Sequence, residues 1–184
     1  LLLLCFVSIV TQLRAEPFVE HLEPAALTRD HTNRLTLAGS ELDRAQLLWT
    51  ALPAKFFQVK PLESKPDRTE LEVTIAADCP LGIYGLRLAT EDGLSNLHLF
   101  VIDEMHGSKL EGDTPLKTFP GAIDGDLTAA TVDRISLEVT AGQTLSFDIF
   151  SSRLGTDADP LLTLVNEQGK RIAQRDNSPG LFYD

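Results

Sequence analysis

The chain has 184 residues, of which 43% are hydrophobic and 23% charged, and its formal net charge is −11. This composition is typical of a globular protein and excludes the disordered and fibrous classes. The sequence contains no cluster of Lys and Arg that could neutralise a run of phosphates. Nucleic-acid binding is therefore excluded, and an anionic membrane surface is disfavoured as a partner.

The first fifteen residues resemble the apolar region and cleavage site of a secretory signal peptide. Residues 1–10 (LLLLCFVSIV) are almost wholly apolar, and Ala15 ends the short polar stretch that follows. Ten apolar residues are too few to span a bilayer. We predict a partial signal peptide over residues 1–15 and an exported protein that is secreted, periplasmic or on the cell surface. The alternative is a buried N-terminal strand or a short anchor.

The cysteine content agrees with this prediction. Cys5 would leave with the signal peptide, so the mature chain would keep Cys79 alone. A single thiol forms neither an internal disulfide nor a cysteine-type zinc site. We predict that Cys79 is a small packed hydrophobic residue rather than a nucleophile.

The region after residue 16 is dominated by apolar residues that alternate with polar ones. This period of two indicates half-buried antiparallel strands with one apolar face turned inward. Turn signals such as Ala38-Gly39-Ser40 and Glu91-Asp92-Gly93 separate the strands, as in sandwiches and barrels. We predict an all-β protein of two tandem antiparallel β-sandwiches. The inward residues would be Leu35 and Leu37; Leu71, Val73 and Ile75; Tyr84, Leu86 and Leu88; Leu97, Leu99 and Val101; Ile135, Leu137 and Val139; and Leu145, Phe147 and Ile149.

The alternation lapses between residues 103 and 121, where Gly, Pro and mixed charges predominate. Such a stretch is typical of a boundary between domains. We predict one sandwich over residues 16–104, a linker over 105–112 and a second sandwich over 113–184. Because the sequence stops within an expected strand, we expect the second sandwich to be incomplete.

Four segments of the first domain form a recognisable pattern, 17–24 (PFVEHLEP), 34–42 (RLTLAGSEL), 45–49 (AQLLW) and 79–90 (CPLGIYGLRLAT). In these segments the domain resembles an IPT/TIG-type immunoglobulin-like module. Gly39 would turn between strands, and Gly82 would allow the hairpin that starts a long core strand. The chain departs from the family at residues 28–31 (TRDH), where a Gly-rich turn is usual.

The second domain contains the segments 121–126 (GAIDGD), 132–139, 141–147 (AGQTLSF) and 157–164 (DADPLLTL), with Gly169 and Asp176 after them. In these segments it resembles the bacterial pre-peptidase C-terminal (PPC) domain, a jelly-roll-like β-sandwich. The chain departs from the family at residues 128–132. The resemblance implies an appendage of a secreted enzyme that binds substrate polymer or assists export.

Aspartates in two turns are candidate ligands for calcium. Alternate Asp residues in a loop can direct their carboxylates at one hard cation, and the PPC resemblance implies calcium near such loops. We predict Asp157, Asp159 and Asp176 as the first choice of Ca²⁺ ligands, ahead of the turn at Asp124 and Asp126. The competing interpretation is that these residues only hydrogen-bond the backbone of their own turns.

The remaining candidates are aromatic residues and histidines. Trp49, Phe56 and Phe57 form the single concentration of aromatic residues, which would stack on a sugar ring or a partner if exposed but more simply pack in the core. His98 is predicted to face solvent, and no two of the four histidines are close in the sequence.

The sequence contains no motif of a zinc hydrolase, an α/β-hydrolase or a nucleotide-binding site. We therefore predict a non-catalytic binding or spacer region of a bacterial multidomain protein. Its partners would be an extracellular polymer or protein, or neighbouring domains of the same chain. The alternative is the accessory part of a secreted peptidase-like hydrolase whose catalytic domain lies beyond residue 184.

Overall fold

Strands account for nearly all the regular structure, which confirms the predicted all-β class. The computed structural model describes residues 15–127 and 131–176. The signal-peptide prediction and Cys5 lie outside these residues. Within them, no helix has the length and apolar character that crossing a bilayer would require.

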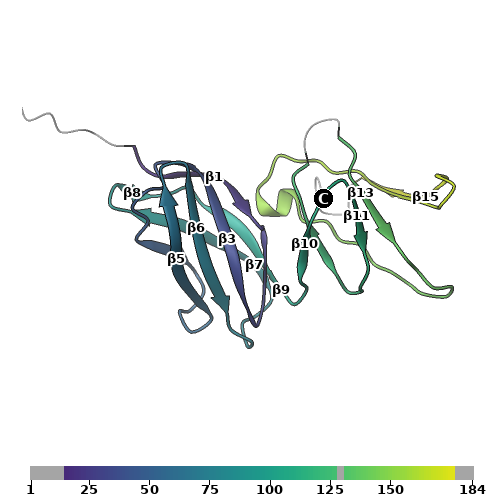
Figure 1. The fold of residues 1–184 in the computed structure, drawn as a ribbon, viewed down its shortest axis with the longest axis horizontal. Helices are drawn as coiled ribbons and strands as arrows, with labels where there is room; N and C mark the ends of the chain where they lie inside the picture. The colour runs from purple at the N-terminus through teal and green to yellow at the C-terminus, as the bar shows by residue number, and fades with distance from the viewer. Residues whose placement is uncertain (1–14, 128–130, 177–184) are drawn as a thin grey trace, which may run out of the picture.

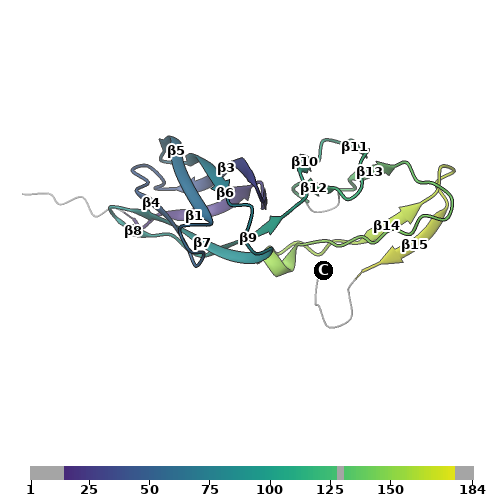
Figure 2. The ribbon, with the colours of Figure 1, turned by 90° about the horizontal axis from the view of Figure 1, so that it is seen from below.

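The first unit is a sandwich of two sheets (Figures 1 and 2). One sheet has the strand order β1-β3-β6-β5, and every pairing in it is antiparallel. Its strands are β1 (Phe18–Glu23), β3 (His31–Ser40), β5 (Phe57–Lys65) and β6 (Arg68–Ile75). Pro61 cannot donate a backbone hydrogen bond, and it lies on the edge strand β5, beside a register shift between Pro61 and Glu63.

The other sheet has the order β2-β9-β7-β4, and β8 also pairs with β7. Its pairings are antiparallel except that β2 runs parallel to β9. Its strands are β2 (Ala26–Thr28), β4 (Leu47–Thr50), β7 (Gly82–Thr90), β8 (Gly93–Leu94) and β9 (His98–Asp103).

The hydrophobic core fills the space between these two sheets. Side chains on β3, β6 and β7 enter it with the predicted period of two, and Cys79 is fully buried among them, as predicted. For the last strand the prediction is wrong for Leu97 and Leu99, which lie on the outer side while Phe100 and Ile102 point inward. Val101, the third residue predicted to face inward, is buried. Both alternating sets in this strand are apolar, so periodicity alone could not distinguish them.

Two glycines and one aspartate lie where the backbone conformation or a close backbone approach restricts the choice of residue. Gly82 begins β7 with φ of 151°, a conformation that favours glycine. Gly39 lies within β3 rather than at a turn, since it pairs with Val19 and an added Cβ would collide with the backbone of Phe18. Asp30 adopts φ of 59° in the turn between β2 and β3. Aspartate tolerates this left-handed conformation better than most residues.

The described residues of the C-terminal unit, 105–127 and 131–176, form three two-stranded ladders and a short 3₁₀ helix, η1 (Ser152–Leu154). Strand β10 (Gly107–Lys109) pairs in parallel with β12 (Ala122–Asp124), and β11 (Asp113–Leu116) pairs in parallel with β13 (Arg134–Leu137). Strand β14 (Leu162–Val165) pairs antiparallel with β15 (Arg171–Arg175). The predicted linker therefore contains a strand, β10.

The pairing in this unit differs from the antiparallel strands expected at residues 135–139 and 145–149. Strand β13 pairs with β11, and residues 143–150 form no strand. Alternation identifies the face that a strand would bury, but a strand also needs a partner. Among the described residues none pairs with this segment, so Phe147 stays exposed, and Val132 is 78% exposed. The domain boundaries themselves remain a prediction.

Candidate functional site

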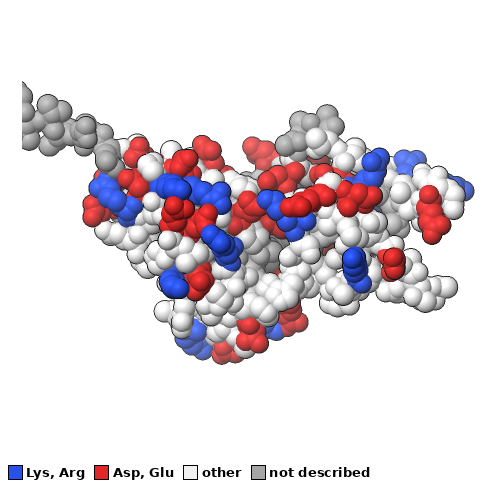
Figure 3. Space-filling model, viewed as in Figure 1, with Lys and Arg blue, Asp and Glu red and all other residues white. Residues whose placement is uncertain are grey.

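The two outer faces of the sandwich differ in chemistry, and this difference singles out a candidate binding surface. On the sheet of β1, β3, β6 and β5, charged side chains of opposite sign alternate (Figure 3). Glu70 accepts hydrogen bonds from Arg34 Nε at 3.1 Å and from Arg68 Nε at 3.0 Å. The hydrogen bond from Arg34 is the main reason that the pKa of Glu70 lies below its usual value. This face is therefore charge-compensated.

The outer face of the other sheet is apolar. The inward positions Leu48, Leu86 and Leu88 are buried, so the alternate residues of β4 and β7 point outward. The outward positions of β4, β7 and β8 carry one charged side chain, Arg87. We call this surface the apolar face and define it by its large exposed residues, which are Leu47, Trp49, Ile83, Leu94 and Leu97.

The apolar face is flat at Gly85 of β7, because glycine has no side chain there. A Cβ added to Gly85 of β7 would lie 2.8 Å from Leu97 Cδ1, so the Leu97 side chain crosses directly over the Gly85 backbone. Trp49 lies opposite Arg87 in the β4–β7 ladder, and the Arg87 guanidinium donates to the Ser95 carbonyl oxygen at 3.0 Å. The Arg87 side chain is thus held beside Trp49.

The three residues of the predicted aromatic cluster lie in different environments. Phe57 is buried in the core, and Phe56 packs against the core from a partly buried position with Lys55 over its ring at 4.2 Å. Trp49 is 48% exposed, and its neighbour Leu47 is 58% exposed. The expectation of core packing is therefore correct for Phe57 and wrong for Trp49, because Leu48 takes the inward position of this short strand.

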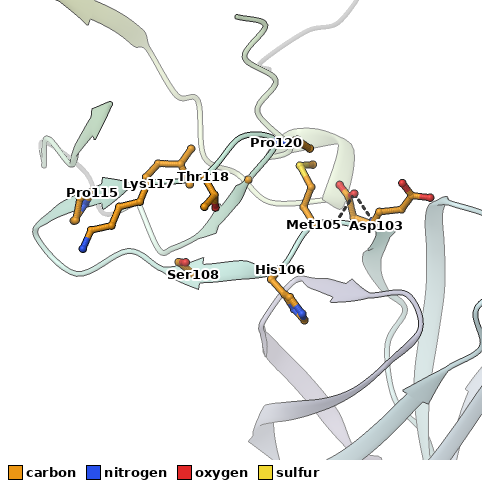
Figure 4. A pocket seen from close by; sticks show the side chains of 11 residues that line it. Asp103, Met105, His106, Ser108, Pro115, Lys117, Thr118 and Pro120 are labelled. Atoms are coloured by element: carbon orange, nitrogen blue, oxygen red, sulfur yellow. Dashed lines mark hydrogen bonds between the residues drawn. The ribbon is translucent and has the colours of Figure 1, made fainter. Parts of the chain in front are cut away.

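A pocket of about 690 Å³ lies where the sandwich meets the C-terminal unit (Figure 4). One wall is the segment from Asp103 to Ser108, and the other is formed by residues 115–118, 120 and 121. The Asp103 carboxylate accepts backbone N–H bonds from Glu104 and Met105, at 2.5 and 3.1 Å. Asp103 therefore stabilises the turn that leads out of β9, and its carboxylate is already engaged.

Polar contacts connect the sandwich to the C-terminal unit beside β1 and β2. Lys109 forms an ion pair with Glu23, and Arg29 forms one with Glu104. The carboxylate of Asp124 accepts a hydrogen bond from the Ala25 N–H at 3.2 Å. Burial raises the pKa of Asp124, whereas the hydrogen bond from Lys109 lowers the pKa of Glu23.

The predicted calcium ligands are not gathered into one cluster. Asp157, Asp159 and Asp176 are all exposed. Within residues 15–127 and 131–176, no group of three or more His, Cys, Asp or Glu side chains is arranged to hold a metal ion. In the other candidate turn, Asp124 binds Ala25 and Asp126 lies 3.6 Å from His21 Nε2. Calcium binding by this chain stays a prediction.

The prediction that His98 faces solvent is wrong. His98 Nε2 lies 2.6 Å from the Val19 carbonyl oxygen, and the Asn96 side chain contacts the same backbone group. His98 therefore joins the start of β9 to β1 in the opposite sheet. Alternation with Leu97 and Leu99 gave no signal of this contact, because it depends on a strand 79 residues away.

Comparison with known proteins gives few matches. No protein-family profile matches the chain, and no curated protein matches it in sequence. Among solved structures, the chain is similar to SGBP-B of the mixed-linkage glucan utilization locus of Bacteroides ovatus, solved in complex with a mixed-linkage heptasaccharide. The TM-score is 0.37 and the identity 16%, over 55% of this chain and 25% of that protein. The chain thus spans about a quarter of the length of the protein it matches.

Proposed function

We propose that this chain is a non-catalytic binding region of an exported bacterial protein, and that its apolar face binds an extracellular polymer or protein. The main observation in support of this proposal is the difference in chemical character between the two outer faces of the sandwich. Both faces are built from outward-pointing residues of antiparallel strands, yet one is charged and ion-paired while the other is apolar. Contiguous exposed apolar surface of this kind is typical of interaction sites.

The composition of the apolar face supports binding. It combines one Trp with an Arg whose guanidinium is already held in place, and both residue types are enriched among those that dominate binding energy. The strands beneath the apolar face are hydrogen-bonded to one another in a sheet, so little backbone conformational entropy would be lost on binding.

We also retain as proposals the IPT/TIG-like identity of the first unit and the PPC-like identity of the second.

Trp49 provides a direct assay, because it is the single tryptophan of the chain. Its fluorescence therefore reports on the apolar face. We expect a partner that covers this face to shift Trp49 emission to shorter wavelength and to protect it from iodide quenching. Soluble β-glucans, peptidoglycan fragments and purified surface proteins are suitable first probes.

Matched variants test whether the apolar face is responsible. Leu97→Ser and Leu94→Ser remove exposed apolar side chains from this face, and we expect their combination to weaken binding at least about tenfold, since each loses about 1–2 kcal/mol of apolar contact. Leu62→Ser removes a similarly exposed leucine from β5, in the other sheet, and should leave binding unchanged. Equal binding by wild type and the Leu94/Leu97 variant would refute the proposal.

A further inference from the structure

Two histidines that are 75 residues apart in the sequence meet where the sandwich joins the C-terminal unit. The ring centroids of His31 and His106 lie 4.1 Å apart, with the ring planes at 85°. His31 is the first residue of β3, and His106 immediately precedes β10. His106 points from its segment toward the turn between β2 and β3, away from the interior of the 690 Å³ pocket (Figure 4).

The hydrogen bond of His31 prepares this ring as a metal ligand. His31 Nδ1 lies 3.2 Å from the Arg29 carbonyl oxygen. A carbonyl oxygen only accepts, so Nδ1 carries the hydrogen, and in the neutral form of the ring Nε2 is the nitrogen with the free lone pair. Metal-binding histidines have this same arrangement, in which one ring nitrogen donates to a carbonyl or carboxylate and the other binds the metal.

The backbone that presents His106 is fixed by two hydrogen bonds at the preceding residue. The Met105 carbonyl oxygen accepts a hydrogen bond from Thr28 Oγ1 at 3.0 Å, and the Met105 N–H donates to Asp103. The residues that follow His106 pair with β12. Both imidazoles are therefore attached to ordered backbone, and both are exposed, so water can complete the coordination of an ion.

We propose that His31 and His106 together bind a divalent transition-metal ion, with Cu²⁺ preferred over Ni²⁺ and Zn²⁺, and so fasten the C-terminal unit to the sandwich. Neutral imidazole is a good ligand for these three ions, and the order follows their general affinity for nitrogen ligands. Each metal–nitrogen bond is about 2.0–2.1 Å long, so two imidazole nitrogens bound to one ion lie about 3 Å apart. The 4.1 Å between the two ring centroids places both imidazoles within reach of a single ion.

The test is calorimetric titration of the full chain with Cu²⁺ in a buffer that does not coordinate metals. We expect His31→Ala and His106→Ala each to weaken the site at least about tenfold, as loss of a metal ligand should do more than loss of an outer partner. His21→Ala is the matched control, because His21 is also partly exposed but lies beside Asp126 and outside the pair. It should leave the affinity unchanged.

Electron paramagnetic resonance of the Cu²⁺ complex provides a second measurement, and it should show nitrogen couplings from two imidazoles that fall to one in either variant. Circular dichroism checks that each variant is folded, and His31→Gln and His106→Gln replace any alanine variant that is not. The proposal is overturned if either single variant binds Cu²⁺ like the wild type, or if His21→Ala weakens binding as much as they do.

Discussion

The substitution Asn96→Ala tests how the two sheets of the sandwich are joined. Asn96 Oδ1 accepts the Val19 N–H at 2.8 Å, and Asn96 Nδ2 donates to the Val19 carbonyl oxygen at 2.8 Å. Val19 is on β1, an edge strand, and is fully buried. The Asn96 amide thus replaces the neighbouring strand that the outer side of β1 lacks.

The loss of stability caused by Asn96→Ala can be estimated from the Val19 backbone groups that would lose a hydrogen-bond partner. The Val19 N–H would lose its acceptor, and an unsatisfied buried donor costs about 1–3 kcal/mol. The Val19 carbonyl oxygen would keep His98 Nε2 at 2.6 Å and so adds little to the cost. We expect the free energy of unfolding to fall by about 2 kcal/mol. His98→Ala alone should cost less, because Asn96 still donates to the carbonyl oxygen.

Denaturant unfolding followed by Trp49 fluorescence measures these values. Gln58→Ala is the control, since it removes an exposed side-chain amide from β5 in the other sheet. The double variant Asn96→Ala/His98→Ala should be destabilised by more than the sum of the single variants, because only then does the Val19 carbonyl oxygen lose both donors. The reasoning is refuted if Asn96→Ala stays within about 0.5 kcal/mol of Gln58→Ala, the range of ordinary surface substitutions.

Two further predictions concern ionisable groups. Burial raises the pKa of Asp124 above the ordinary value of 3.8, so the native state loses stability as the pH rises above 3.8, and the full penalty is present above the native pKa. Asp124→Asn, which keeps an acceptor for the Ala25 N–H, should raise the melting temperature at pH 7, and the gain should vanish at about pH 3, where Asp is protonated in both states. A gain of equal size at both pH values would contradict this. Burial also raises the pKa of the Cys79 thiol, with the Asp78 charge adding to the effect. In a Cys5→Ser background, native protein should therefore not react with Ellman's reagent at pH 8 on a timescale on which denatured protein reacts fully, and rapid native labelling would show that the thiol is accessible.

Much of the sandwich core could be predicted from alternation. Leu35, Leu37, Leu71 and Val73 are inward-facing, as expected, because the neighbouring positions in β3 and β6 are polar. The same reasoning failed for the last strand of the sandwich, where both alternating sets are apolar. The exposed Leu97 of the second apolar set was in fact a signal of the apolar face, since a strand covered on one side only does not need apolar residues on both.

The sequence by itself determined the all-β class, the inward residues of the first sheet and the burial of Cys79, because these follow from local alternation and from the cost of exposing apolar side chains. Only the tertiary structure decided that Trp49 is exposed, that His98 joins the two sheets and that His31 meets His106. Each of these depends on which distant strands become neighbours, and a period of two within one strand says which side a residue faces but not what lies across from it.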